Sequence, residues 1–398
     1  MTDNTVLLCM GTRPEIIKMA PVYHALKKTE LTPLVLHTGQ HDTLAEALYP
    51  FFEMEPDFKF DLSRERNSLG HLFAIKMERM DQLFAELDTS AVLVQGDTSS
   101  ALSGALTAFY HKIPVGHIEA GLRSHHDYEP YPEEKNRELI ARLSLWHFAP
   151  TRRALMNLEK EGIAKDNCFL VGNTIVDSVN WALQHVDKPS FDPAPEALNA
   201  IRWLESNAEN TRLVVVTAHR RESWDGQIAE IARGIRSIAE KYPDIRIIWP
   251  VHPNPIVKNA VHEAMHGLDV GAKKQVWLCD PLNYPDMLYF MKHSWLVLTD
   301  SGGLQEEAVT LKIPVLVLRD KTERPEVVDA HGGALIGTSS RSILDWVGKL
   351  HTDCNQYNAL ISPSNPFGDG NTGKNIAEIL QDKLIDHTHS VDINVGVN

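Results

Sequence analysis

Three carboxylates in the first half of the chain follow segments that resemble buried strands, and together they could transfer protons. Asp97 follows the apolar run at 91–94, Glu119 follows the run at 115–118, and Glu133 follows Pro132 at the start of a helical pattern. Sites in α/β proteins form at the carboxyl ends of parallel strands, where these three could meet. Converging carboxylates shift one another's pKa values and can divide acid and base roles. Taken singly, Asp97 could instead cap a helix, and Glu133 could be a first-turn helix acid.

One glycine turn near the amino terminus could hold a phosphate group. Gly11 ends the apolar run at 6–10, and Pro14 suits the first turn of a new helix. The helix would offer free N–H groups, with Arg13 beside them and Lys18 about one turn further on. The alternative is an ordinary strand-to-helix turn with a surface arginine.

A second glycine turn has the pattern of a nucleotide-sugar site. Ser301, Gly302 and Gly303 follow the apolar run at 295–299 and precede a helical pattern. The glycines let backbone N–H groups approach a diphosphate, and Glu307, one turn beyond, could bind both hydroxyls of a ribose. An ordinary capped helix is the alternative. The nucleotide-sugar interpretation is favoured because two adjacent glycines serve no obvious packing need.

Two histidines follow further strand-like runs. His219 follows the run at 213–217 and could neutralise or protonate a leaving phosphate, with Arg220 or Arg221 adding charge. His252 follows the run at 245–249. It could contact the ligand or pack against the prolines on either side of it.

Several motifs argue against other chemistry. The segment 262–266 reads HEAMH and fits the HExxH pattern of zinc proteases, but it lacks the longer metzincin extension and lies among polar residues. A solvated helix face is the simpler interpretation, and we expect no metal. The sequence has neither GxGxxG after the first strand nor GxxxxGK[ST], so we expect no nucleotide cofactor.

Composition excludes further classes of protein. The 398 residues include 39 basic and 53 acidic side chains, for a net charge of −14, which argues against a nucleic-acid or anionic-membrane partner. No apolar run approaches the roughly 18–20 residues of a membrane helix. The first residues lack a signal-peptide pattern, and the four widely spaced cysteines are typical of a reducing compartment, so we expect a cytoplasmic protein.

These residues require a scaffold of alternating strands and helices. Apolar runs followed by turns and helical patterns predict an α/β fold with two Rossmann-like, doubly wound domains that face each other across a cleft. The proline-rich segment at 187–195 is the expected linker. We predict an amino-terminal domain at 1–186, a carboxyl-terminal domain at 187–370, a helix at 371–386 that packs back on the first domain, and a tail at 387–398.

Ordered motifs along nearly the whole chain resemble the non-hydrolysing UDP-N-acetylglucosamine 2-epimerases. They include GTRPEIIKMAPV (11–22), QGDTSSALSGALTAFY (95–110), PVGHIEAGLRS (114–124), TAHRRES (217–223), PVHPNP (250–255), LTDSGGLQEEA (298–308) and RDKTERPE (319–326). The resemblance implies a GT-B-like pair of domains and a homodimer. It also implies conversion of UDP-GlcNAc to UDP-ManNAc for surface polysaccharide, with no nicotinamide cofactor.

The same resemblance assigns roles to residues. It implies that UDP leaves C1 of the sugar, that a carboxylate takes the C2 proton, and that UDP adds again after a proton returns to the other face. The implied acid, base and histidine groups are Asp97, Glu119, Glu133 and His219. The implied contacts to UDP are Arg13, Lys18, Arg137, Ser301, Gly302, Gly303 and Glu307.

The chain departs from the family at Lys321, where a threonine is usual, and in two segments. In some bacterial members a second UDP-GlcNAc acts as an activator, and Gln40, His41 and Arg66 match residues of that site, whereas 42–44 differ. The loop at 125–129 also differs and lies between Glu119 and Glu133, so it could alter sugar choice. The remaining alternatives are an epimerase for another UDP-sugar such as a diacetamido uronic acid, a hydrolysing epimerase, a glycosyltransferase and a non-catalytic UDP-sugar sensor.

Overall fold

The computed structural model describes residues 4–39, 43–62, 68–206, 211–220 and 226–386. The chain divides into two compact units. The first comprises residues 1–178 and 367–398, and the second comprises 179–366. The division falls inside one helix, α8 (Thr174–Val186), a few residues before the proline-rich segment in which we expected it. The predicted tail at 387–398 lies outside the described residues.

The first unit is built on a parallel sheet that, in the described residues, has seven strands in the order β3-β2-β1-β4-β5-β6-β7. The central strands are apolar and buried on both faces, as a sheet covered by helices requires. The strands are β1 (Thr5–Met10), β2 (Thr32–His37), β3 (Phe58–Lys59), β4 (Ala91–Gln95), β5 (Val115–Ile118), β6 (Trp146–Ala149) and β7 (Cys168–Leu170).

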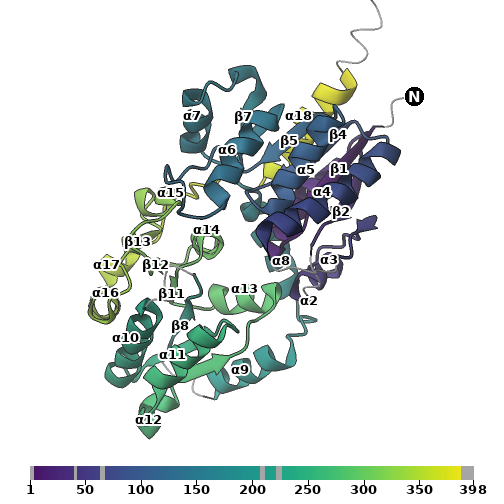
Figure 1. Ribbon diagram of the computed structural model, residues 1–398. Helices are drawn as coiled ribbons and strands as arrows, with labels where there is room; N and C mark the ends of the chain where they lie inside the picture. Colours follow the sequence, from purple (N-terminus) through teal and green to yellow (C-terminus); the bar gives the residue numbers. More distant parts are fainter. Residues whose placement is uncertain (1–3, 40–42, 63–67, 207–210, 221–225, 387–398) are drawn as a thin grey trace, which may run out of the picture. The chain divides into compact units, whose positions relative to one another are not determined.

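Helices connect these strands and cover the sheet (Figure 1). Helices α4 and α5 enclose one core, in which Met80 and Phe84 meet the buried side chains of β1 and β4. The helices of this unit are α1 (Arg13–Leu26), α2 (Thr43–Glu46), α3 (Leu48–Phe51), α4 (Leu69–Glu86), α5 (Ser99–Tyr110), α6 (Glu133–Leu143) and α7 (Arg152–Lys160).

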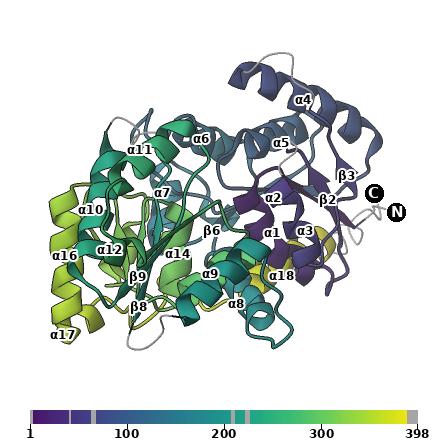
Figure 2. The same ribbon diagram turned by 90° about the horizontal axis from the view of Figure 1, so that it is seen from below.

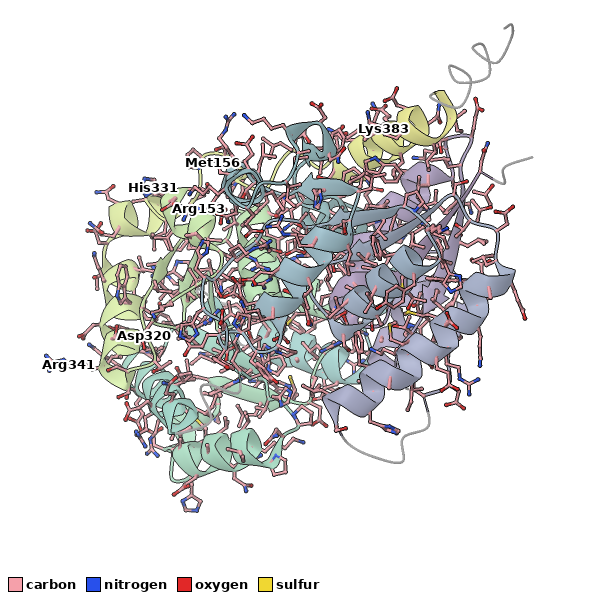
Figure 3. All side chains as sticks on the ribbon, turned by 45° about the horizontal axis from the view of Figure 1, so that its top comes forward. Arg153, Met156, Asp320, His331, Arg341 and Lys383 are labelled. Carbon is pink, nitrogen blue, oxygen red and sulfur yellow. The ribbon has the colours of Figure 1, made fainter. Side chains whose placement is uncertain are left out.

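The end of the chain returns to the first unit. Helix α18 (Thr372–Gln381) packs against α1, and Figure 2 shows the two side by side. The packing is close, because a Cβ at Gly373 would lie 2.7 Å from the carbonyl oxygen of Pro21. Asp177 on α8 accepts a hydrogen bond of 2.9 Å from the backbone N–H of Gly373. Lys383, labelled in Figure 3, lies just beyond this helix.

The second unit has its own parallel sheet, with six strands in the described residues and the order β10-β9-β8-β11-β12-β13. The strands are β8 (Arg212–Thr217), β9 (Ile245–Pro250), β10 (Val276–Cys279), β11 (Leu296–Thr299), β12 (Val315–Val317) and β13 (Gly333–Leu335). Every predicted strand segment of either unit is confirmed, with ends that differ by no more than two residues.

Helices of the second unit enclose a core around the fully buried Trp249. Figures 1 and 2 both show α10 beside α16, where a Cβ at Gly234 would meet Ile343 at 3.1 Å. None of the helices in the described part of the chain is both long and apolar enough to span a membrane. The helices are α9 (Pro195–Glu205), α10 (Gln227–Lys241), α11 (Pro255–Met265), α12 (Val270–Lys273), α13 (Tyr284–Lys292), α14 (Gly302–Thr310), α15 (Pro325–Asp329), α16 (Ser340–Thr352) and α17 (Cys354–Asn358).

One buried acid in the second unit predicts a pH-dependent stability. Asp286, in the first turn of α13, is almost fully buried, and its Oδ2 accepts a hydrogen bond from the N–H of Ala194. Burial raises the pKa of Asp286 to about 6. The folded protein therefore favours the protonated acid, and ionisation costs stability as the pH rises from about 4, the pKa in the unfolded chain, to about 6.

We expect Asp286→Asn to remove this cost. At about 1.4 kcal/mol per pKa unit, the variant should gain up to about 3 kcal/mol relative to the wild type between pH 4 and pH 7.5. Urea unfolding of both proteins at the two pH values measures this change. A stability difference that stays constant with pH would contradict the prediction.

Candidate functional site

In the described residues, each sheet has one point at which the strand order reverses, and the polar residues of interest lie there. In the first sheet the reversal lies between β1 and β4, and in the second it lies between β8 and β11. At such a point the connecting helices leave toward opposite faces, which opens a crevice beyond the carboxyl ends of the strands. Gly11 and Asp97 follow the first pair of strands, and His219 and Ser301 follow the second.

Glu119 follows β5 and is held by a buried cation. Its Oε2 lies 2.7 Å from Nζ of Lys18, and the Gln95 side-chain amide donates to the same oxygen. Both charged side chains are buried, so the ion pair is only weakly screened by solvent. Glu119 also has a φ of +66°, in the left-handed region. Such strain persists only where the surroundings impose it, and it gathers at functional sites.

Asp97 also pairs with a cationic side chain, that of Arg137 on α6. Its Oδ2 accepts hydrogen bonds from Nε of Arg137 at 2.7 Å and from Nη2 at 2.6 Å. Asp97 and Glu119 follow neighbouring strands, joined at their ends by a hydrogen bond of 3.0 Å from Gly96 to Ile118. The structure therefore places two of the three predicted carboxylates at one sheet edge, each with its own cation.

Glu134 is a buried acid that binds both a backbone loop and Arg137 at this edge of the sheet. Burial alone would raise its pKa, but backbone N–H groups of Ser124 and His125 and the Arg137 guanidinium hold the pKa below its usual value. Glu134 thereby connects the loop after Glu119 to the cation that binds Asp97. Glu133, the first residue of α6, lies next to it in the chain and is partly buried.

The glycine turn after β1 differs from our expectation. The prediction of free N–H groups is wrong for Gly11 and Thr12, because both donate to the Glu15 carboxylate, at 2.9 Å and 2.7 Å. Glu15 is fully buried, which raises its pKa, and it also accepts a hydrogen bond from Thr98. The spacing from Thr12 to Glu15 is that of a capping box and could have revealed this role. Arg13 is exposed at the start of α1.

Asp300 organises the turn after β8 in the second unit. Its Oδ2 accepts hydrogen bonds from the backbone N–H groups of His219 at 2.8 Å and Arg220 at 2.9 Å. Its Oδ1 lies 3.2 Å from Nδ1 of His219. The imidazole of His252 stacks on that of His219, with 5.9 Å between ring centroids. The structure thus brings the two predicted histidines together, and it adds Asp300, which the sequence analysis did not select.

Gly302 and Gly303 begin α14 and have different surroundings. A Cβ at Gly302 would lie 3.1 Å from Oε1 of Glu323, with the guanidinium groups of Arg220 and Arg324 at 3.6 Å. A Cβ at Gly303 would meet nothing within 4 Å. A methyl group at position 302 would therefore press on the Glu323 carboxylate, whereas Gly303 faces open space at a helix start, which is where an anion can bind.

A cluster of arginines lies behind this helix start. Glu323 lies 2.5 Å from guanidinium nitrogens of both Arg220 and Arg319, and Arg324 pairs with the buried Glu306 at 2.5 Å. Burial alone would raise the pKa of Glu323, but the neighbouring guanidinium groups hold it well below its usual value. The charged run RDKTERPE was the available sequence signal for this cluster.

The remaining candidate residues are the proposed ribose ligand, the activator site and the HExxH segment. Glu307 is buried in α14. The pKa of Tyr284 is raised, first by the burial of Tyr284 and second by the negative charge of Glu307. The candidate activator residues Gln40, His41 and Arg66 lie outside the described residues. The HExxH segment begins on α11, but that helix ends at Met265, so His266 lies beyond it. Within the described residues, no group of three or more histidine, cysteine or acidic side chains could hold a metal ion.

Two doubly wound parallel units, each with polar residues at its switch point, define an α/β protein of the GT-B-like class. Residues 24–381 match the family model described as UDP-N-acetylglucosamine 2-epimerase. The chain belongs to this family.

Relatives and solved structures agree with this assignment. The chain is 40% identical over 382 residues to the UDP-N-acetylglucosamine 2-epimerase of Escherichia coli K12, covering 96% of this chain and 99% of that protein. It is 39% identical to the Yersinia pestis enzyme of the same name, with the same coverage. A Neisseria meningitidis UDP-GlcNAc 2-epimerase bound to UDP-GlcNAc superposes with a TM-score of 0.87 at 36% identity, covering 95% of this chain and 100% of that one.

Proposed function

We propose that this protein interconverts UDP-GlcNAc and UDP-ManNAc without hydrolysis and thereby supplies ManNAc units for surface polysaccharide. The observation that carries the proposal is the pair of carboxylates, Glu119 and Asp97, each bound to a cation at one sheet edge. A glycosyltransferase or a UDP-sugar sensor would need a UDP site but not this arrangement. An epimerase needs it, because a proton must be removed and returned.

The chemistry requires two bonds to break on neighbouring carbon atoms. As the C1–O bond breaks, its electron pair leaves with UDP and positive charge develops at C1. That charge makes the C2 proton acidic enough for a carboxylate to take it, and a C1–C2 double bond remains. Return of a proton to the opposite face, followed by addition of UDP at C1, gives the epimer. We assign the proton transfers to Asp97, Glu119 and Glu133.

The second unit supplies the groups for UDP. We propose that the diphosphate binds over the start of α14, at Ser301, Gly302 and Gly303, where backbone N–H groups and the helix dipole favour negative charge. Glu307, one turn along the same helix, is assigned to the ribose hydroxyls. His252 completes this group beside His219. In the first unit, Arg13, Lys18 and Arg137 are assigned to the substrate, and Lys18 and Arg137 also pair with Glu119 and Asp97.

Proton NMR of the purified protein with UDP-GlcNAc in D2O tests this function. We expect signals of UDP-ManNAc to grow while deuterium enters C2. Free ManNAc and UDP would indicate a hydrolysing enzyme instead. No reaction by a folded protein would overturn the proposal and favour another UDP-sugar, such as a diacetamido uronic acid, or a transferase.

The two glycines of α14 give a matched pair of variants. Gly303→Ala should leave the melting temperature unchanged, because nothing lies within 4 Å of the new methyl group, yet it should weaken UDP binding about tenfold or more. Gly302→Ala should lower both the melting temperature and the affinity. Calorimetric titration with UDP and thermal melting measure these effects. Unchanged affinity in Gly303→Ala would contradict the assigned diphosphate position.

We also propose that the protein acts in the cytoplasm as a homodimer, as the resemblance to the family implies. Sedimentation velocity of the purified chain tests the oligomeric state. A single species with the mass of one 44.7 kDa chain at working concentration would overturn the dimer.

A further inference from the structure

Asp300 connects two neighbouring strands of the second unit through a single buried carboxylate. It follows β11 directly, and β11 pairs with β8 in a register that places Thr299 opposite Thr217. One carboxylate oxygen binds the backbone N–H groups of His219 and Arg220, and the other faces the His219 ring at 3.2 Å. The backbone of His219 is therefore bound, and its ring is contacted, by the same residue.

The contact selects one tautomer of the His219 ring. An ionised carboxylate can only accept hydrogen bonds, so this close contact, which is not aligned as a hydrogen bond in the structure, favours the ring with its proton on Nδ1 over the ring with a lone pair there. His252 is held in the opposite way, because its Nδ1 accepts a hydrogen bond of 3.2 Å from the N–H of Asn254. When neutral, the two stacked rings thus carry their protons on different nitrogens.

We propose that Asp300 is a positioning residue that keeps the proton of neutral His219 on Nδ1, so that Nε2 exchanges a proton with the diphosphate of the UDP-sugar. This inference rests on the proposed function. As C1–O breaks, the electron pair stays on the diphosphate oxygen, and the proton on Nε2 of the imidazolium moves to that oxygen. The ring that remains is the Nδ1–H tautomer that Asp300 already holds, so no rotation is needed before re-addition returns the proton.

The burial of the two groups fits these roles. The Asp300 side chain has no exposed surface, whereas 42% of the His219 side chain is exposed. Asp300 therefore cannot meet a ligand itself, and it acts only through the ring and the backbone of its partner.

Nitrogen-15 NMR of the full-length protein, labelled at histidine and free of substrate, tests the tautomer. A His219→Gln variant assigns the signal, and the spectra are recorded at a pH at which the ring is neutral. We expect His219 to show a protonated Nδ1 and an unprotonated Nε2. In Asp300→Asn the amide oxygen can keep the backbone hydrogen bonds while its NH2 group faces Nδ1, so the tautomer should reverse.

Kinetics provide a second readout. Asp300→Asn should lower kcat about 100-fold or more and change KM for UDP-GlcNAc much less, because the wrong tautomer impairs chemistry more than binding. Asp280→Asn is the matched control, since Asp280 is an exposed acid that pairs with Lys258 in the same unit. This control should retain both the His219 signal and kcat.

The outcomes separate this inference from the proposed function. A wild-type His219 protonated on Nε2, or an Asp300→Asn variant with an unchanged tautomer, would overturn the role of Asp300. If Asp300→Asn fails to fold, the wild-type spectrum decides by itself. The expected tautomers in a protein without epimerase activity would support Asp300 as the residue that holds His219 and would overturn the proposed function.

Discussion

Asp97→Asn is expected to lower kcat by about 1,000-fold or more while UDP still binds, because an amide cannot accept the C2 proton. Asparagine has nearly the same shape as aspartate and can still accept one hydrogen bond from Arg137. The backbone carbonyl of residue 97, which accepts a hydrogen bond from Asn136 at 2.7 Å, is unaffected. The fold of this sheet edge should therefore persist, and the loss should appear in the chemical step.

The NMR assay in D2O can be run from each epimer separately, which makes this prediction sharper. If Asp97 acts on one face of the sugar, the Asp97→Asn variant should exchange deuterium into C2 more slowly when the reaction starts from one epimer than when it starts from the other. Asp81→Asn is the control, because Asp81 is an exposed acid that pairs with His111 on the same unit. An Asp97→Asn protein with wild-type turnover would exclude Asp97 from proton transfer.

Glu323→Gln should destabilise the second unit by about 3–5 kcal/mol, the usual cost of removing one partner from a buried ion pair. Glu323 is buried among the guanidinium groups of Arg220, Arg319 and Arg324, which would be left without their shared anion. The pKa of Glu323 is lowered in the folded protein, so its contribution to stability is complete above the unfolded pKa near 4.5. The difference between wild type and variant should therefore shrink as the pH falls below that value.

Urea unfolding at pH 7.5 and at progressively lower pH measures this difference. Asp345→Asn is the matched control, because Asp345 pairs at 3.7 Å with Arg341, whose side chain extends into solvent (Figure 3). Removing such an exposed pair should change stability by less than about 0.5 kcal/mol. Equal effects of the two substitutions would show that the Glu323 cluster contributes no more than a surface ion pair.

The sequence by itself predicted the central strands and selected the polar residues that follow them. Apolar runs such as 91–94 and 213–217 are strands because parallel strands buried on both faces must be apolar along their whole length. Because sites in such sheets lie at the carboxyl ends of the strands, position along the chain was enough to select Asp97, Glu119 and His219. The ordered motifs indicated the family, which the relatives confirm.

Only the tertiary structure decided which charged groups meet. Lys18 and Glu119 are 101 residues apart, and His219 and Asp300 are 81 residues apart. Periodicity describes neighbours within one element, whereas these contacts depend on the strand order that brings β1 and β5, or β8 and β11, to a common edge. The use of Glu15 to bind the N–H groups of Gly11 and Thr12 and the return of α18 to the first unit were settled in the same way. Buried polar groups take whichever partners the packed chain places within reach, because leaving them unpaired costs too much free energy.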